Sequence, residues 1–136
     1  MEDYKHKNIH KSEKQVFSIV KRAKSFSYAI NGIRLFIKTT HNAWIHILIG
    51  IIVVCLGLYF NITTIEWLFL VFAIGFVLVS EAFNTAIEFD IDLTSPEYHP
   101  YAKYTKDVAA GAVLISSITA LIVGLIIFLP KFMAIL

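Results

Sequence analysis

Three apolar segments, each long enough to cross a membrane, constrain this chain more than any other feature. A membrane-spanning helix needs about 20 mainly apolar residues. The third segment carries no charge over the whole stretch from Val108 to Leu129. With 57% of its residues hydrophobic and 16% charged, the chain is predicted to be an all-α membrane protein rather than a soluble domain. We place the three spans at about residues 43–60, 66–92 and 106–129.

The residues before the first span predict a different kind of helix. Apolar residues recur at helical spacing from Val16 to Ile37, while lysines and arginines occupy the other faces. We expect an amphipathic surface helix over about residues 15–38, preceded by a mobile basic tail over residues 1–14. Such a helix lies along the inner leaflet or packs against the spans, and the sequence leaves both open. Residues 15–136 are predicted to form a single membrane-embedded domain.

The positive charges are distributed unevenly along the chain. Nine of the 12 lysines and arginines precede the first span, two lie between the second and third spans, and none lies in residues 61–66. Cytoplasmic loops of membrane proteins carry the excess of lysine and arginine. We therefore expect the N-terminus and the 89–107 loop in the cytoplasm, with the 61–66 connection and the C-terminus outside.

A polar stripe continues the second span. At about 100° per residue, four side chains fall on one helix face: Glu81, Asn84, Glu88 and Asp92. Asp90 points away from this face and is left out of the site. An ionisable side chain at bilayer depth costs at least about 2.5 kcal/mol, so it rarely persists without a partner or a task. The stripe is therefore the first candidate for a functional site.

The positions of these side chains suggest chemical roles. Glu81 lies deepest, and apolar surroundings disfavour the charged form of a carboxyl, which suits it to act as a general base. Glu88 and Asp92 lie nearer water and suit a hard cation such as Mg²⁺, which takes carboxylate and phosphate oxygens. Lys106 and Asp107, across the following loop, are candidates for a phosphate partner and a further ligand.

Two other interpretations of the stripe remain open at this point. It can be a polar cluster that only holds the spans together, or part of a pathway for protons or cations. The chain contains neither a Walker-type phosphate-binding loop nor the glycine fingerprint of dinucleotide-binding domains, so the common nucleotide sites are excluded.

The stretch from Glu81 to Asp92 resembles the Glu-x-x-Asn-[Ser/Thr]-Ala-Ile-Glu-x-x-x-Asp signature of the small bacterial integral-membrane diacylglycerol kinases and their undecaprenol kinase relatives. Residues 106–113 resemble the second signature of that family, and the similarity covers roughly residues 26–130. The resemblance implies ATP-dependent phosphorylation of a lipid hydroxyl, on diacylglycerol or undecaprenol, with Mg²⁺. It also implies a bacterial inner-membrane protein with a cytoplasmic site and no nucleic-acid partner.

The same resemblance assigns roles by motif position. It makes Glu81 the general base and Glu88 a metal ligand. It assigns nucleotide or phosphate contacts to Tyr28, Asn84, Asp92, Lys106 and Asp107. Family members are homotrimers with shared sites, and three spans alone enclose little room for a triphosphate, a metal ion and a lipid headgroup.

One position departs from the family pattern. The family places a second metal-binding Glu where this chain has Thr40, which offers a neutral hydroxyl instead of a charge. The alternative that follows is a catalytically weakened or inactive relative.

Overall fold

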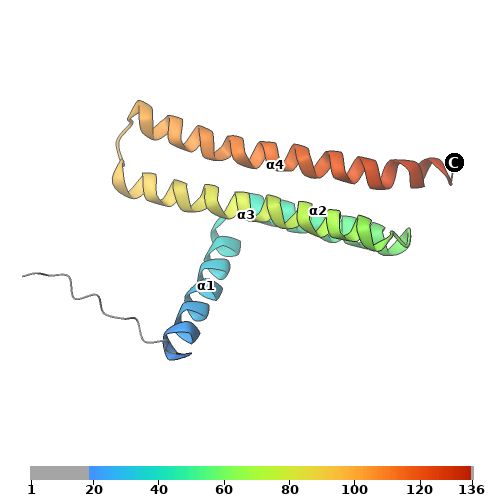
Figure 1. The fold of residues 1–136 in the computed structure, drawn as a ribbon. Coiled ribbons are helices and arrows are strands. Elements are labelled where there is room, and N and C mark those ends of the chain that lie inside the picture. Colours follow the sequence, from blue (N-terminus) through green and yellow to red (C-terminus); the bar gives the residue numbers. More distant parts are fainter. Residues whose placement is uncertain (1–18, 136) are drawn as a thin grey trace, which may run out of the picture. The chain divides into compact units, whose positions relative to one another are not determined.

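The computed structural model describes residues 19–135, and the predicted tail over residues 1–14 lies outside this range. The described residues form four helices: α1 (Ile19–Thr39), α2 (His41–Tyr59), α3 (Thr64–Thr94) and α4 (Pro100–Met133) (Figure 1). The prediction of an all-α chain is therefore confirmed. The three later helices are each long and apolar enough to cross a membrane, as the sequence predicts.

The three helices extend beyond the predicted spans at one or both ends, most of all α4. This helix begins at Pro100, before the span predicted from residue 106, and continues through Pro130. Proline is well placed at the first helical position, because the N–H that it lacks would have no partner in the helix there. The side chain of His99 caps this end, since its Nδ1 accepts a hydrogen bond of 3.3 Å from the Tyr101 N–H.

The chain divides into two compact units, and the division falls within α1 after Gly32. The first unit contains most of α1, a helix without acidic residues whose side chains are exposed from Lys21 to Ala29. The location of α1 at a membrane surface stays a prediction. The second unit contains the end of α1 and the three long helices, which carry the polar stripe.

Helix α3 is the centre of the second unit, because it packs against both α2 and α4. Figure 1 shows α4 running back alongside α3 from the loop that joins them. The apolar core lies toward the α2–α3 turn and is formed by Ile62, Leu70, Ile127 and Phe128. Many large apolar side chains elsewhere on α2–α4 are exposed, as expected for helices that face lipid.

The α2–α3 turn satisfies the backbone at both helix ends. Asn61 has a left-handed backbone with φ of 48°, which asparagine tolerates better than most residues. The Ile62 N–H bonds to the Gly57 carbonyl at 3.1 Å, which is the usual closure of a helix that ends this way. Helix α3 then begins with a capping box between Thr63 and Glu66. Lys131 of α4 adds an ion pair of 2.8 Å to Glu66.

Small residues form the seam between α2 and α3. The buried residues of α2 are Ala43, Gly50 and Gly57, at intervals of seven. A methyl group on Gly57 would lie 2.8 Å from the Trp67 ring, and one on Gly50 would lie 3.4 Å from Ile74. The absence of side chains at these glycines lets the two helices approach closely, as is common where membrane helices pack.

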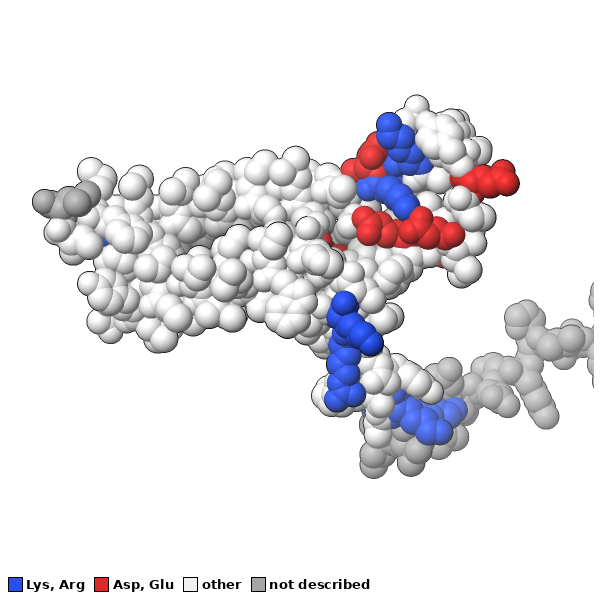
Figure 2. Space-filling view, turned by 180° about the vertical axis from the view of Figure 1, so that it is seen from behind, with Lys and Arg blue, Asp and Glu red and all other residues white. Residues whose placement is uncertain are grey.

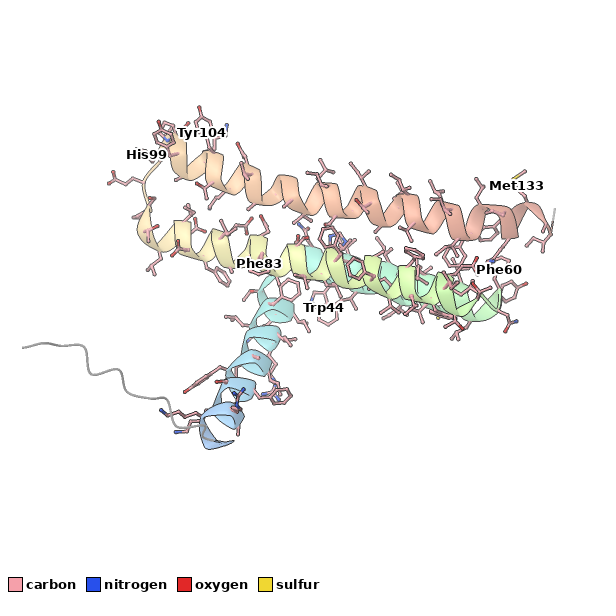
Figure 3. The ribbon with its side chains drawn as sticks, in the orientation of Figure 1. Trp44, Phe60, Phe83, His99, Tyr104 and Met133 are labelled. Atoms are coloured by element: carbon pink, nitrogen blue, oxygen red, sulfur yellow. The ribbon has the colours of Figure 1, made fainter. Side chains whose placement is uncertain are left out.

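Helix α3 is longer than a membrane is thick. Its 31 residues extend for about 46 Å, whereas the hydrocarbon core of a bilayer is about 30 Å thick. The helix is therefore about ten residues longer than a perpendicular crossing of the apolar layer needs, and its charged residues after the first turn lie in its C-terminal part. Figure 2 shows acidic and basic side chains together at this end of α3 and α4. Figure 3 places His99 and Tyr104 at the same end, and Phe60 and Met133 at the other.

Candidate active site

The polar stripe of α3 passes from the protein interior to its surface. Glu81 is 1% exposed and Asn84 is 7% exposed, although both are polar. Glu88 is partly exposed and Asp92 is exposed. The stripe therefore links a buried carboxyl near the edge of the apolar layer to the charged end of the helix.

The deep part of the stripe contains two acceptors without donors. Asn84 donates from Nδ2 to Glu88 Oε1 at 3.0 Å. Its other amide atom, Oδ1, is buried without a hydrogen-bond partner among the described residues, and the same is true of Glu81 Oε1. Most buried polar atoms in proteins have a partner, so each such atom needs an explanation. A hydrogen-bond donor or a cation would satisfy both atoms.

An ion pair closes the shallow end of the stripe. Lys106 of α4 contacts Asp92 Oδ1 of α3 at 2.5 Å, and both side chains reach solvent. An exposed pair of this kind contributes at most about 1 kcal/mol to stability. The ion pair matters more because it fixes the position of the Lys106 ammonium group. This group has three hydrogen-bond donors, and Asp92 uses only one of them. The other donors of Lys106 remain available for phosphate oxygens.

Two further predicted site residues are exposed. Asp107 is exposed, and its side chain has no hydrogen bond or ion pair within residues 19–135. Tyr28 lies on α1 in the first compact unit and is 70% exposed. Asp90 is exposed and its side chain also contacts no member of the stripe.

The oxygen donors fit a magnesium ion only in part. No three His, Cys, Asp or Glu side chains come together as a metal site in the described part of the chain. Glu88 still offers a carboxylate beside the buried amide oxygen of Asn84. Mg²⁺ commonly binds through one or two carboxylates and takes its other ligands from phosphates and water. These residues therefore fit Mg²⁺ that arrives with a nucleotide.

Thr85 is a neighbour of the site that the sequence analysis did not single out. Its Oγ1 lies 2.9 Å from Thr40 Oγ1 and 3.0 Å from the Glu81 carbonyl oxygen. Thr85 follows Glu81 by four residues, so it lies near the same helix face. The four-residue spacing from Glu81 could have indicated that Thr85 belongs to the site. However, a threonine within a helix usually forms a hydrogen bond only to a carbonyl of its own helix.

An apolar groove of about 420 Å³ runs between α2 and α4, with α3 as its floor. Its lining includes Gly50 of α2, Leu70 and Val77 of α3, and Gly124 of α4. Val77 precedes Glu81 by about one turn, so the groove lies near the buried carboxyl. The groove has room for an apolar chain beside the polar stripe.

The sequence profile of the prokaryotic diacylglycerol kinases matches residues 27–128, which include the stripe, the ion pair and both sides of the groove. The chain belongs to the prokaryotic diacylglycerol kinase family. It is therefore a membrane lipid kinase that uses ATP.

Individual relatives support this family assignment. An undecaprenol kinase of Bacillus subtilis is 40% identical over 108 residues, which are 79% of this chain and 88% of that protein. A diacylglycerol kinase of Synechocystis is 36% identical over 113 residues, covering 82% of this chain and 65% of that protein. A diacylglycerol kinase of Escherichia coli is 29% identical over 86 residues, covering 63% and 68%. These matches lend no support to a non-enzymatic membrane protein.

Proposed function

We propose that this lipid kinase transfers the γ-phosphoryl group of ATP to the hydroxyl of undecaprenol, with diacylglycerol as the second candidate. The observation that carries the proposal is Glu81 Oε1, a buried carboxyl oxygen without a donor near the edge of a membrane span. A lipid hydroxyl is a donor that reaches this depth. Undecaprenol is placed first because a relative named undecaprenol kinase shares 40% of the aligned residues and most of its length.

In the proposed reaction, Glu81 is the general base. Its carboxylate accepts the proton of the lipid hydroxyl, and the lipid oxygen forms a bond to the γ-phosphorus of ATP. The bond between that phosphorus and the oxygen of the β-phosphate breaks, and ADP leaves. Such a transfer depends mainly on positioning and on charge stabilisation at the phosphoryl oxygens.

The rest of the stripe would hold the nucleotide. Lys106 offers donors to phosphate oxygens, and its ion pair with Asp92 keeps the ammonium group at the charged end. Glu88 would hold Mg²⁺, and when bound with ATP this ion neutralises charge on the phosphates. Asn84 orients Glu88 through their hydrogen bond. We further assign nucleotide contacts to Tyr28 and Asp107, on the family resemblance alone.

We also propose a cytoplasmic site in the inner membrane and a homotrimer. ATP is available in the cytoplasm, and the excess of lysine and arginine before α2 favours that side for the N-terminus. Among its described residues, one chain brings no three His, Cys, Asp or Glu side chains together for the metal, and its groove of about 420 Å³ has an apolar lining that suits a lipid chain better than a triphosphate. Neighbouring subunits would complete the site.

A phosphorylation assay in lipid vesicles tests the proposal. Purified protein is given ATP, Mg²⁺ and either undecaprenol or diacylglycerol, and the phosphorylated lipid is measured. Glu81→Gln should abolish turnover and leave ATP binding largely intact, because the amide keeps the shape but accepts no proton. Glu97→Gln, in the exposed loop, is the matched control and should stay active. Turnover by Glu81→Gln would exclude Glu81 as the base, and faster phosphorylation of diacylglycerol would reverse the order of substrates.

A further inference from the structure

The N-cap residue of α2, Thr40, uses its side chain to contact another helix instead of capping its own. Thr40 flanks the first turn of α2 in extended conformation, where a threonine commonly caps its own helix. Its hydroxyl makes no such bond and instead lies 2.9 Å from the hydroxyl of Thr85 on α3. Thr85 is 6% exposed, so the contact is shielded from water on that side.

The number of protons fixes the direction of this contact. Each threonine hydroxyl has one proton to donate. Thr85 lies 3.0 Å from the Glu81 carbonyl oxygen, which can only accept, so Thr85 uses its proton there. Thr40 must then be the donor to Thr85. The result is a chain of two hydrogen bonds that runs from α2 through Thr85 to the backbone of Glu81.

The register of α2 on α3 places this contact beside the buried carboxyl. Gly57 lies against Trp67 and Gly50 lies against Ile74, so a step of seven residues along α2 matches a step of seven in the opposite direction along α3. One more step brings Ala43 opposite Glu81. Ala43 is fully buried, in agreement with this register. The first turn of α2 therefore covers the turn of α3 that carries Glu81.

We propose that the Thr40–Thr85 hydroxyl pair is a positioning contact, which holds the first turn of α2 against the Glu81 turn so that the carboxyl is placed for proton transfer. This inference rests on the proposed role of Glu81. It assigns a function to Thr40 that differs from metal binding, and it adds Thr85 as a residue that acts through its neighbours.

A double-mutant cycle on the full-length protein in vesicles tests the contact. Thr40→Val, Thr85→Val and the double variant replace each hydroxyl by a methyl group of similar size. The turnover number, the KM for ATP and the number of nucleotide sites per chain are measured. We expect each single variant to lower kcat about tenfold, since small displacements of catalytic groups have effects of this size or larger. The double variant should be no slower than the single variants, because they break the same contact.

Three comparisons separate positioning from a general loss of structure. Thr85→Ser keeps the hydroxyl and should restore most of the activity. Thr119→Val is the matched control, because Thr119 bonds only to the Ile115 carbonyl of its own helix at 2.9 Å and is exposed. The number of nucleotide sites should not change in any variant, whereas partial unfolding would lower it in proportion to kcat.

Several results would overturn the proposal. These are a Thr85→Val variant within twofold of the unmodified protein, additive losses in the double variant, or a parallel loss of nucleotide sites. Failure of the positioning proposal can be distinguished from failure of the proposed role of Glu81, because different variants test them. Turnover by Glu81→Gln would remove the role of Glu81, whereas the cycle reports whether the two hydroxyls act together whichever group accepts the proton.

Discussion

Asn84 is joined to Glu88 by a hydrogen bond of 3.0 Å, and this bond decides which way both side chains face. The amide nitrogen of Asn84 is turned toward the carboxylate, and the amide oxygen is buried without a hydrogen-bond partner among the described residues. The two residues are one turn apart on α3. The carboxylate of Glu88 is thereby held in one orientation before any ligand arrives.

Glu88→Gln should weaken the binding of Mg²⁺ together with ATP. The variant removes the charge that would hold the cation, and we expect the Mg²⁺ concentration for half-maximal activity to rise about tenfold or more. Magnesium titrations of the lipid kinase activity measure the change. Asp90→Asn is the matched control, because Asp90 is exposed and its side chain contacts no residue of the stripe. An equal shift in both variants would show that net charge, and not Glu88, is responsible.

Thr40→Glu should lower the Mg²⁺ requirement. A carboxylate at this position near the stripe contributes on the order of 1 kcal/mol to cation binding, which is a several-fold change in affinity. The Thr85 hydroxyl can turn to bond the new carboxylate. Thr39→Glu is the control, since Thr39 is exposed and bonds only to the Leu35 carbonyl at 2.8 Å. A flat Mg²⁺ dependence would mean that the metal is held by other residues, whereas a lower kcat with an unchanged Mg²⁺ requirement would reflect the lost hydroxyl contact between Thr40 and Thr85.

Lys106→Met should raise the KM for ATP several-fold, because it removes the ammonium group that the Asp92 ion pair places at the charged end. Steady-state kinetics at saturating lipid give the value. Lys103→Met, one turn earlier on α4 at an exposed position, should change the KM much less. If both variants behave alike, the effect is a general attraction of ATP to positive charge.

Gly57→Ala should destabilise the fold by about 1–3 kcal/mol, since the added methyl group would lie 2.8 Å from the Trp67 ring. Thermal unfolding of the purified protein in detergent measures the loss as a lower Tm. Gly75→Ala provides the comparison, because a methyl group there has no neighbour within 4 Å. An unchanged Tm for Gly57→Ala would show that the ring moves aside easily.

The proposed orientation can be tested with single cysteines in a Cys55→Ala background. A cysteine at Asn61 should react with an impermeant thiol reagent added from outside the inner membrane, and a cysteine at Tyr98 should be protected. Both positions are exposed in the structure, so burial does not explain a difference. The opposite pattern would place the stripe on the side without ATP and contradict the proposed function.

The sequence predicted the helices well because length and apolar composition alone decide whether a segment can span a membrane. It also predicted that Glu81, Asn84 and Glu88 share a face, since this follows from helical spacing. It did not predict the contact between Thr40 and Thr85, which are 45 residues apart and meet only through the register of two helices. The six residues of α4 before the predicted span could not be assigned from apolar composition, because Pro100–Thr105 are mostly polar and aromatic and lie before the uncharged segment.

The interval between the small residues of α2 also determines how α2 and α3 cross. A straight helix has 3.6 residues per turn, so positions seven apart drift by about 20° around its axis. Ala43, Gly50 and Gly57 can all face α3 only if the two helices wind slightly around each other in the left-handed sense. One repeated interval thus sets both the distance between the helices and the handedness of their supercoil.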